Sequence, residues 1–495
     1  MSLINITNLT FSYDGSYDTI FENVSFQLDT DWKLGFTGRN GRGKTTFLNL
    51  LLGKYTYTGK ISSSVSFEYF PFEVVDKTQL TIDIIRSYAP LSEDWQIIKE
   101  LNLLEVSDDT LYRPFYTLSN GERTKALLSA LFLKENSFLL IDEPTNHLDA
   151  EARKAVCSYL SRKKGFILVS HDRVFLDGCI DHVLSINRAN IDIQKGSFSS
   201  WLKNKEMQDN FELAQNEKLK KDIKRLSDAA KRTAEWSDKA ESRKIGFDPT
   251  KEEKNIARRP KEAAKAKKMM SRSKAIHERQ VTAIDNKSKL LKNIEQSADL
   301  KISPLKFHTA NLLTLDKVSV LYGERVVCDN VSFTINVGDR IALSGKNGCG
   351  KSSILKLICG ENIPYMGNIA INSQLKISYA EQNTENLSGS LLEYADKYNI
   401  DFSLFLAILR KLDFSRIQFE YNIEEFSEGQ KKKVLIARSL CEKAHLYIWD
   451  EPLNFIDVIS RMQIENLILE YKPTLIFVEH DNAFCDNIAT GYVYL

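Results

Sequence analysis

Two glycine-rich segments of the chain have the residue types and the spacing that bind phosphate groups. Residues 38–45 read GRNGRGKT and residues 345–352 read GKNGCGKS, so both match G-x-x-x-x-G-K-[S/T]. In this motif, backbone N–H groups and the lysine contact phosphate oxygens, and the Ser or Thr hydroxyl ligates Mg²⁺. Each segment follows an apolar stretch and precedes a helical pattern, as a phosphate loop requires. We expect Lys44 and Lys351 to reach the β/γ-phosphates of a nucleotide.

Each half also contains an apolar, strand-like segment that ends in two acids, Asp142-Glu143 in the first and Asp450-Glu451 in the second. Such a pair is more often only a turn or a helix cap, but its repetition after a phosphate loop favours catalysis. The first acid of each pair is expected to hold Mg²⁺ through water. The second is expected to act as a general base on the attacking water.

A histidine follows another apolar segment in each half. The interval from Glu143 to His171 is nearly the same as the interval from Glu451 to His480. A single histidine is more often a surface residue or a satisfied core residue. The repeated spacing favours contact with the γ-phosphate at both positions.

These features form an internal repeat. The two phosphate-loop lysines are 307 residues apart, the paired glutamates 308 and the paired histidines 309, and Ser119 and Ser427 are also 308 apart. Motifs that recur in one order at one offset indicate duplicated domains. We therefore predict α/β domains over residues 1–200 and 301–495.

Residues 201–300 differ from both halves. They contain one glycine, 26 Lys and Arg, and 17 Asp and Glu, so they are basic although the whole chain has a net charge of only +1. Heptad-like apolar positions predict two helices, and Ile245–Thr250, with its Gly and Pro, predicts the loop between them. At 1.5 Å per residue, such a hairpin arm would be roughly 50 Å long. The alternative is a solvated spacer.

Composition excludes several classes of protein. No apolar run approaches the length of roughly 18 residues that a transmembrane helix needs, and the first residues do not resemble a signal peptide. The seven cysteines include no C-x-x-C pair, so disulfide frameworks and zinc sites are not expected. We expect a cytoplasmic protein with reduced thiols.

A resemblance to a known family follows from two further segments, 118–122 (LSNGE) and 426–430 (FSEGQ). Ser-x-Gly-[Glu/Gln], at the same distance before the catalytic Glu in each half, resembles the signature of ATP-binding cassette (ABC) ATPases. The resemblance implies an α/β fold with two P-loop ABC ATPase domains joined by a long two-helix linker, and ATP and Mg²⁺ as cofactors. It also implies a monomer whose two domains pair head to tail, with each ATP between the phosphate loop of one domain and the signature of the other.

The resemblance then assigns residues to two sites. Site one joins the first phosphate loop, Asp142, Glu143 and His171 to the second signature, and site two joins the second phosphate loop, Gln382, Asp450, Glu451 and His480 to the first signature. The nucleotide-binding residues are Tyr13, Gly38, Asn40, Gly41, Gly43, Lys44, Thr45, Thr46, Ser119, Gly121, Tyr322, Gly345, Asn347, Gly348, Gly350, Lys351, Ser352, Ser353, Ser427 and Gly429. The Mg²⁺ ligands are Thr45, Asp142, Ser352, Gln382 and Asp450, and the catalytic residues are Glu143, Glu451, His171 and His480. Tyr13 and Tyr322 would stack on adenine, although each could simply be a strand tyrosine.

The two halves depart from the family pattern in different ways. The family's Q-loop glutamine is present as Gln382, but the equivalent place in the first half is occupied by Phe72, which can neither ligate Mg²⁺ nor orient water. The second signature has Phe426 and Glu428 in place of the usual Leu and Gly. We expect unequal sites, with site two the faster.

Two cassettes, a basic linker and no membrane segment resemble the ABC-F group, whose members act on the ribosome. The first cassette is short and the chain ends at Leu495, soon after His480, and in both respects it resembles the antibiotic-resistance, Lsa-type subgroup. That resemblance implies ribosome protection: binding of the 50S/70S ribosome at the exit (E) site, contact with 23S rRNA and P-site tRNA, and displacement of lincosamides, streptogramin A or pleuromutilins from the peptidyl-transferase centre. The alternatives are a housekeeping ABC-F translation factor and the ATPase subunit of a transporter.

Under this hypothesis the arm contacts RNA. Residues 231–280 carry 16 basic and 8 acidic side chains, which suits phosphate binding that weakens with salt. A solvated helix face would have a similar composition, and aromatic residues could simply pack the arm. The candidate RNA contacts are Trp236, Lys244, Phe247, Lys254, Arg258, Arg259, Lys261 and Lys265, together with Lys267 and Lys268.

Overall fold

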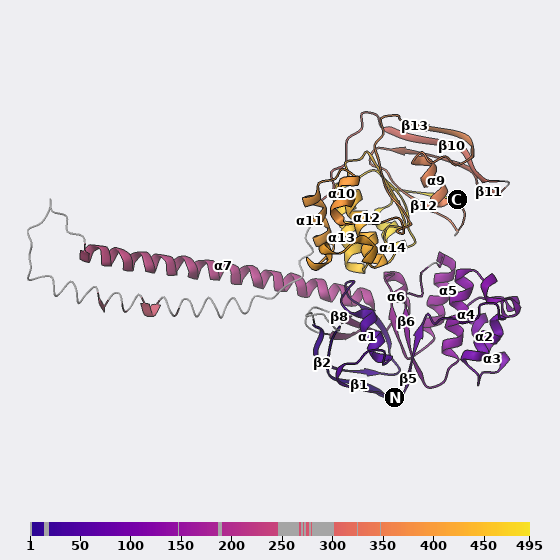
Figure 1. Cartoon of the computed structure of the whole chain (residues 1–495), viewed down its shortest axis with the longest axis horizontal. Helices are drawn as coiled ribbons and strands as arrows, with labels where there is room; N and C mark the ends of the chain where they lie inside the picture. Colours follow the sequence, from indigo (N-terminus) through magenta and orange to yellow (C-terminus); the bar gives the residue numbers. More distant parts are fainter. Residues whose placement is uncertain are drawn as a thin grey trace, which may run out of the picture. The chain divides into compact units, whose positions relative to one another are not determined.

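The computed structural model describes residues 2–13, 19–146, 148–186, 191–245, 267–268, 271, 274–276, 279, 301–323, 325–346 and 348–495. The chain divides into two compact units. One comprises Met1–Trp201 together with Ser297–Leu495, and the other comprises Leu202–Gln296. Within the first unit, elements β1 to β9 form domain one and elements β10 to β17 form domain two (Figure 1).

Domain one contains two sheets and a set of helices. An antiparallel sheet has the order β2-β1-β4, and a six-stranded sheet has the order β5-β6-β7-β3-β8-β9, in which only the β8–β9 pair is antiparallel. The strands are β1 (Leu3–Ser12), β2 (Thr19–Asp29), β3 (Lys33–Thr37), β4 (Thr58–Ser62), β5 (Ser66–Phe70), β6 (Ser137–Asp142), β7 (Phe166–Val169), β8 (His182–Ile186) and β9 (Ile191–Lys195). The helices are α1 (Lys44–Leu51), α2 (Thr81–Tyr88), α3 (Asp94–Leu103), η1 (Asp108–Tyr112), η2 (Phe115–Thr117), α4 (Asn120–Phe132), α5 (Ala150–Ser161) and α6 (Arg173–Cys179).

Domain two repeats this plan. An antiparallel sheet has the order β11-β10-β13, and a parallel sheet has the order β14-β15-β16-β12-β17. The strands are β10 (Asn311–Tyr322), β11 (Arg325–Asn336), β12 (Arg340–Ser344), β13 (Tyr365–Ile371), β14 (Ile377–Ala380), β15 (Leu446–Asp450), β16 (Leu475–Val478) and β17 (Gly491–Tyr494). The helices are α9 (Lys351–Ile358), α10 (Leu391–Lys397), α11 (Phe402–Lys411), η4 (Ile417–Glu420), η5 (Ile423–Glu425), α12 (Glu428–Cys441), α13 (Val458–Tyr471) and α14 (Asn482–Ile488).

The central parallel strands are buried on both faces. Strands β7 and β16 are buried at every position, which explains why their sequences read as continuous apolar runs and do not alternate. The strands that lead into the functional segments, β3, β6, β12 and β15, lie beside them in the same sheets. Parallel order brings the carboxyl ends of these strands to one edge, where the predicted site residues follow.

Helices α1 and α9 each begin directly after a phosphate loop. Their N-caps, Gly43 and Gly350, have φ values of 89° and 98°, a region that side chains rarely adopt. A Cβ atom at Gly43 would also lie 2.5 Å from Cγ2 of Ile20. Glycine is therefore required at this point of the motif for both backbone conformation and space.

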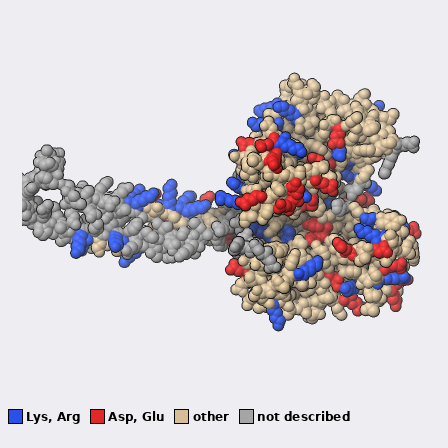
Figure 2. Space-filling view, viewed as in Figure 1, with Lys and Arg blue, Asp and Glu red and all other residues tan. Residues whose placement is uncertain are grey.

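Helix α7 (Phe198–Ile245) is the main described element of the second unit. Its described residues run to Ile245, and the segment 246–250, which the sequence predicts as a loop, lies outside the described residues. Leu219, Ile223 and Leu226 are half-buried, in agreement with the predicted apolar seam, and Lys and Arg side chains line the described part of the helix (Figure 2). Of the predicted second helix, only residues 267–268, 271, 274–276 and 279 are described, and these are helical.

Candidate nucleotide sites

Both phosphate-loop lysines are buried and fold back onto their own loops. Lys44 Nζ donates to the carbonyl of Gly38 at 2.6 Å, and Lys351 Nζ donates to the carbonyl of Gly345 at 2.8 Å. Burial lowers the pKa of Lys44, although the carboxylates around it oppose that shift. An ammonium group held at the mouth of a ring of backbone N–H groups is arranged to bind phosphate oxygens.

The two predicted adenine-stacking tyrosines lie at the ends of their strands and beside the phosphate-loop helices. Tyr13 Oη is 2.7 Å from Thr46 Oγ1, and Tyr322 Oη is 3.3 Å from Ser353 Oγ. Their side chains are 42% and 50% exposed. Each ring therefore combines a fixed hydroxyl with a face that is open for stacking.

The first acid of each pair has the chemistry of a Mg²⁺ ligand. Asp450 is 1% exposed, and neither of its carboxylate oxygens accepts a hydrogen bond from the described residues. Burial raises the pKa of Asp450, and nearby Ser352 and Lys432 oppose that shift. A buried carboxylate with unused oxygens beside a hydroxyl fits a hard cation such as Mg²⁺. In site one, one oxygen of Asp142 already accepts a hydrogen bond from Tyr69 at 2.9 Å.

The two glutamates predicted to be catalytic have a backbone conformation that the sequence does not reveal. Glu143 has φ 48° and Glu451 has φ 47°, which is uncommon for a residue other than glycine. Each lies opposite the predicted histidine: Nε2 of His171 is 3.3 Å from Oε1 of Glu143, and Nε2 of His480 is 3.3 Å from Oε1 of Glu451. Strained backbone at corresponding places in both halves is typical of functional sites.

The surroundings of Glu451 favour its ionised form. Gln382 Nε2 and Asn454 Nδ2 both donate to Oε2 of Glu451, at 2.9 Å and 2.7 Å. Burial alone would raise the pKa of Glu451, but the hydrogen bond and charge of His480, the hydrogen bond from Gln382 and the charge of Lys432 lower it to about 2. This carboxylate is therefore ionised at neutral pH, as a general base must be.

The surroundings of Glu143 favour its protonated form. Burial and the neighbouring Asp142 raise the pKa of Glu143 to about 8, and Arg461 and Lys44 oppose that rise only in part. Phe72, at the position that corresponds to Gln382, stacks on Tyr88 with ring centroids 3.9 Å apart. Site one therefore lacks the amide donor that site two has at this place.

Most of the residues predicted for site two line one cavity of about 970 Å³ between the two domains, but Tyr322, Gly345 and Asp450 are not at its wall. The second domain contributes its phosphate loop and catalytic side chains, and the first contributes its signature. The predicted residues at the wall are Gly348, Gly350, Lys351, Ser352, Ser353, Gln382, Glu451 and His480 from domain two and Ser119 and Gly121 from domain one. Arg153 adds a contact from domain one, because its Nη1 donates to the carbonyl of His480 at 2.8 Å.

The first phosphate loop is in direct contact with domain two. Asn40 Nδ2 donates to the carbonyl of Phe455 at 2.7 Å, and a Cβ atom on Gly429 would lie 2.5 Å from that same oxygen. Arg39 forms an ion pair with Asp413 at 3.4 Å. The first phosphate loop thus packs against the second signature.

Signature residues Ser119 and Ser427 cap helices. Ser119 accepts from the backbone N–H of Glu122 at 3.2 Å, and Ser427 accepts from that of Gln430 at 3.4 Å; each forms a capping box. The Ser-x-x-[Glu/Gln] spacing could have predicted this role from the sequence. Each serine is therefore fixed at a helix N-terminus, where partial positive charge favours an anion.

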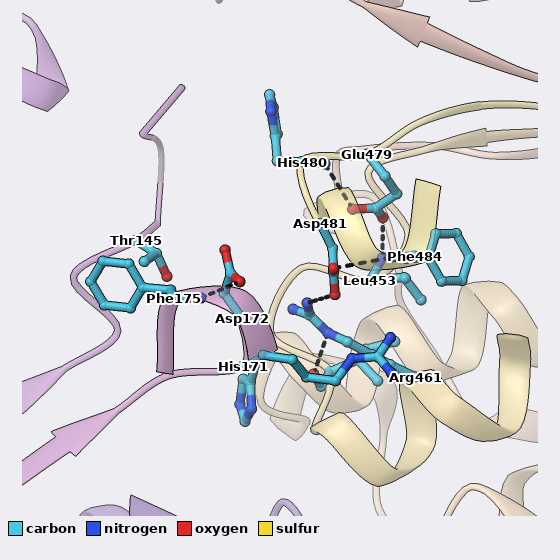
Figure 3. Close-up of polar contacts among 12 residues, drawn as sticks. Thr145, His171, Asp172, Phe175, Leu453, Arg461, Glu479, His480, Asp481 and Phe484 are labelled. Atoms are coloured by element: carbon cyan, nitrogen blue, oxygen red, sulfur yellow. Dashed lines mark hydrogen bonds and ion pairs between the residues drawn. The ribbon is translucent and has the colours of Figure 1, made fainter. Parts of the chain in front are cut away.

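Several polar residues around the sites were not predicted. Lys433 and Asp457 form a buried ion pair at 2.9 Å, and Arg461 pairs with Asp481 at 3.1 Å. Figure 3 shows the Arg461–Asp481 pair beside Glu479, which accepts from the backbone N–H groups of Leu453 and His480. These residues belong to no recognisable sequence motif, so only the folded structure shows that they contact one another.

Some predicted residues lie outside the described part of the chain. They are Asn347, Phe247, Lys254, Arg258, Arg259, Lys261 and Lys265. Trp236 and Lys244 lie in helix α7, but their side chains are not described. Thr45 is exposed at the start of α1, and Gly38, Gly41 and Gly345 all have positive φ values in the two loops.

The fold and both sites agree with a match to a protein family. The family model described as ABC transporter matches residues 21–146 and 328–454, which together exceed half of the chain. The chain therefore belongs to this family: it has two tandem ABC ATPase domains and hydrolyses ATP. Among the described residues, no helix is long and apolar enough to cross a membrane.

Individual relatives cover nearly the whole chain. The ATP-binding protein Uup of Buchnera aphidicola is 28% identical over 99% of this chain and 80% of its own length. The ribosome protection protein VmlR of Bacillus subtilis is 27% identical over 98% of this chain and 85% of its own length. A crystal structure of the archaeal ribosome recycling factor aABCE1 in complex with the ribosomal stalk protein aP1 shares the fold, with a TM-score of 0.62 and 18% identity over 98% of this chain and 87% of that chain.

Proposed function

We propose that this ATPase is a ribosome protection protein of the ABC-F group. It would bind the ribosomal E site and use its interdomain arm to dislodge lincosamide, streptogramin A or pleuromutilin antibiotics from the peptidyl-transferase centre. The observation that carries the proposal is the alignment with a ribosome protection protein over 98% of the chain, which includes the basic linker as well as the ATPase domains.

The described part of the arm supports this proposal. Helix α7 has 48 residues, so at 1.5 Å per residue it is about 70 Å long. Lys218, Lys220, Lys221, Lys224 and Arg225 on it are exposed. Exposed cations along a long helix are suited to RNA phosphates, and a helix of this length can reach a site far from the ATPase domains.

ATP binding and hydrolysis would drive a cycle in which the two ATPase domains close and reopen. With ATP at both sites, each signature serine and helix N-terminus would hold the γ-phosphate bound by the opposite phosphate loop, so that the domains stay closed on the ribosome. Glu451 would accept a proton from the attacking water, and loss of the γ-phosphate would remove the contact that joins the domains. Mg²⁺, when bound by Ser352, Asp450 and Gln382, would neutralise phosphate charge.

The test uses the Glu143→Gln/Glu451→Gln double variant with ATP. We expect it to sediment with 70S ribosomes, and cryo-EM to place residues 241–262 at the peptidyl-transferase centre. The Lys44→Ala/Lys351→Ala variant is the control, because it lacks both phosphate-loop cations and should stay in the supernatant. Ribosome binding without any increase in drug resistance of cells that express the wild-type chain would favour a housekeeping translation factor. Sedimentation with membranes alone would favour a transporter subunit.

A further inference from the structure

Lys432 is a buried cation with an unusual set of partners. It lies on helix α12 and is 3% exposed. Its Nζ donates to the carbonyl of Gln382 at 2.7 Å and to the carbonyl of Glu451 at 3.2 Å, and it lies 3.4 Å from the carbonyl of Glu381. Among the described residues, it forms no ion pair with a carboxylate. Burial lowers its pKa, which the surrounding acids oppose.

These partners belong to three segments that meet at site two. Gln382 lies in the loop after β14, Glu451 follows β15, and Lys432 itself lies in the second turn of the helix that Ser427 caps. The Gln382 and Glu451 side chains are also hydrogen-bonded to each other. One ammonium group thus holds the two backbone segments whose side chains are expected to orient and activate water.

Domain one lacks this arrangement. The offset that relates Ser119 to Ser427 places Thr124 opposite Lys432, and Phe72 opposite Gln382 packs on Tyr88. A buried ammonium is costly to desolvate. Its presence only in the half that also has the glutamine indicates a role in the chemistry of site two.

We propose that Lys432 is a positioning residue of site two, whose ammonium group fixes the backbone of Gln382 and of Glu451 so that their side chains meet at the attacking water. The inference rests on the assignment of site two, and it does not depend on ribosome binding. Lys432 would act on turnover and not on ATP affinity, because the phosphate loop is held by Lys351 and its own carbonyls.

The experiment measures steady-state ATP hydrolysis of the full chain without ribosomes, in a Glu143→Gln background where site two alone can work. We expect Lys432→Met to lower kcat roughly 10- to 100-fold, as small misplacement of catalytic groups does, with KM changed less than about 3-fold. Lys431→Met is the matched control, since Lys431 is the preceding lysine on α12 and its ammonium group pairs with Glu428 at 3.4 Å, on the helix surface and away from the Gln382 and Glu451 backbone. It should keep the parent kcat within about 2-fold.

A second measurement does not depend on activity. In nucleotide-free protein, Lys432→Met should speed amide hydrogen exchange of residues 381–385 by about 10-fold and leave the corresponding loop of domain one unchanged. An unchanged kcat, or a rise in KM alone, would overturn the inference. If Lys432→Met does not fold, Lys432→Gln is judged by the same criteria. An inactive Glu143→Gln parent would overturn the site-two assignment and the inference together, whereas failure to bind ribosomes would contradict only the proposed function.

Discussion

The two glutamates predicted to be catalytic occupy matching positions in the repeat, but their surroundings shift their pKa values in opposite directions. Glu451 accepts hydrogen bonds from two amides and lies beside His480, and the pKa of this carboxyl falls to about 2. The pKa of Glu143 rises to about 8 through burial and the adjacent Asp142. A general base must be ionised to act, so we expect the two sites to hydrolyse ATP at different rates at neutral pH.

This difference predicts unequal effects of one substitution. We expect Glu451→Gln to lower kcat for ATP hydrolysis about 100-fold at pH 7, and Glu143→Gln to lower it less than about 3-fold. Both variants keep the size of the side chain. Phosphate-release assays on the two single variants provide the measurement, and equal losses would contradict the asymmetry.

Glu479 gives a pH-dependent contribution to stability. Burial raises the pKa of Glu479 from 4.5 to about 6. The folded protein therefore holds this proton more tightly than the unfolded chain, so the contribution of Glu479 to stability is full below pH 4.5 and is lost, by about 2 kcal/mol, as pH rises through 6. Glu479→Gln should remove that slope in urea denaturation at pH 4.5 to 6.5. Glu385→Gln, at an exposed carboxylate, should retain it.

Site residues that belong to a local sequence motif could be predicted, whereas residues whose partners are distant in sequence could not. Lys44, Glu143 and His171 follow from local spacing and its repetition. Tyr69 and Lys432 have no such signal, because their partners Asp142 and Gln382 are distant in sequence and meet them only in the folded sheet.

At the scale of elements, the serine of each signature is expected to have two roles: it caps its helix and it contacts the nucleotide. Ser119, Ser427 and Ser390 all form capping boxes, at α4, α12 and α10. Replacing any of them with Ala should cost about 1 kcal/mol of stability. Only Ser119→Ala and Ser427→Ala should also raise the KM for ATP, because Ser390 is outside both sites. An equal rise in KM for Ser390→Ala in ATP titrations would mean that the effect is purely structural.

Element boundaries were best predicted where chemistry fixes them. Helices α1 and α9 begin at Lys44 and Lys351, directly after the two phosphate loops, as the predicted order of strand, loop and helix requires. The antiparallel sheets and their pairing could not be derived, because their half-exposed strands lack a distinctive pattern and their partners are far apart in the chain.

At the scale of the whole molecule, the arm differs from the ATPase domains in net charge. The whole chain has a net charge near zero, but residues 201–300 contain 26 basic and 17 acidic residues and are therefore basic. If exposed lysines on α7 bind RNA phosphates, replacing Lys220, Lys221 and Lys224 with Gln should reduce the slope of log K against log salt by about one unit for each phosphate that the helix no longer binds. Ribosome sedimentation at several salt concentrations measures this slope. Substituting Lys134, which lies on domain one and pairs with Glu68, should leave it unchanged.

The left-handed backbone at Glu143 and Glu451 has a consequence for how the protein tolerates change. Asparagine and glycine occupy that conformation with less strain than glutamate. Replacing Glu451 with Asn would therefore relax the turn while it removes the predicted base of site two, so that the less active variant is expected to outlast the active chain on heating. Selection for heat resistance alone would therefore disfavour glutamate at position 451, so its presence there agrees with the predicted role in ATP hydrolysis.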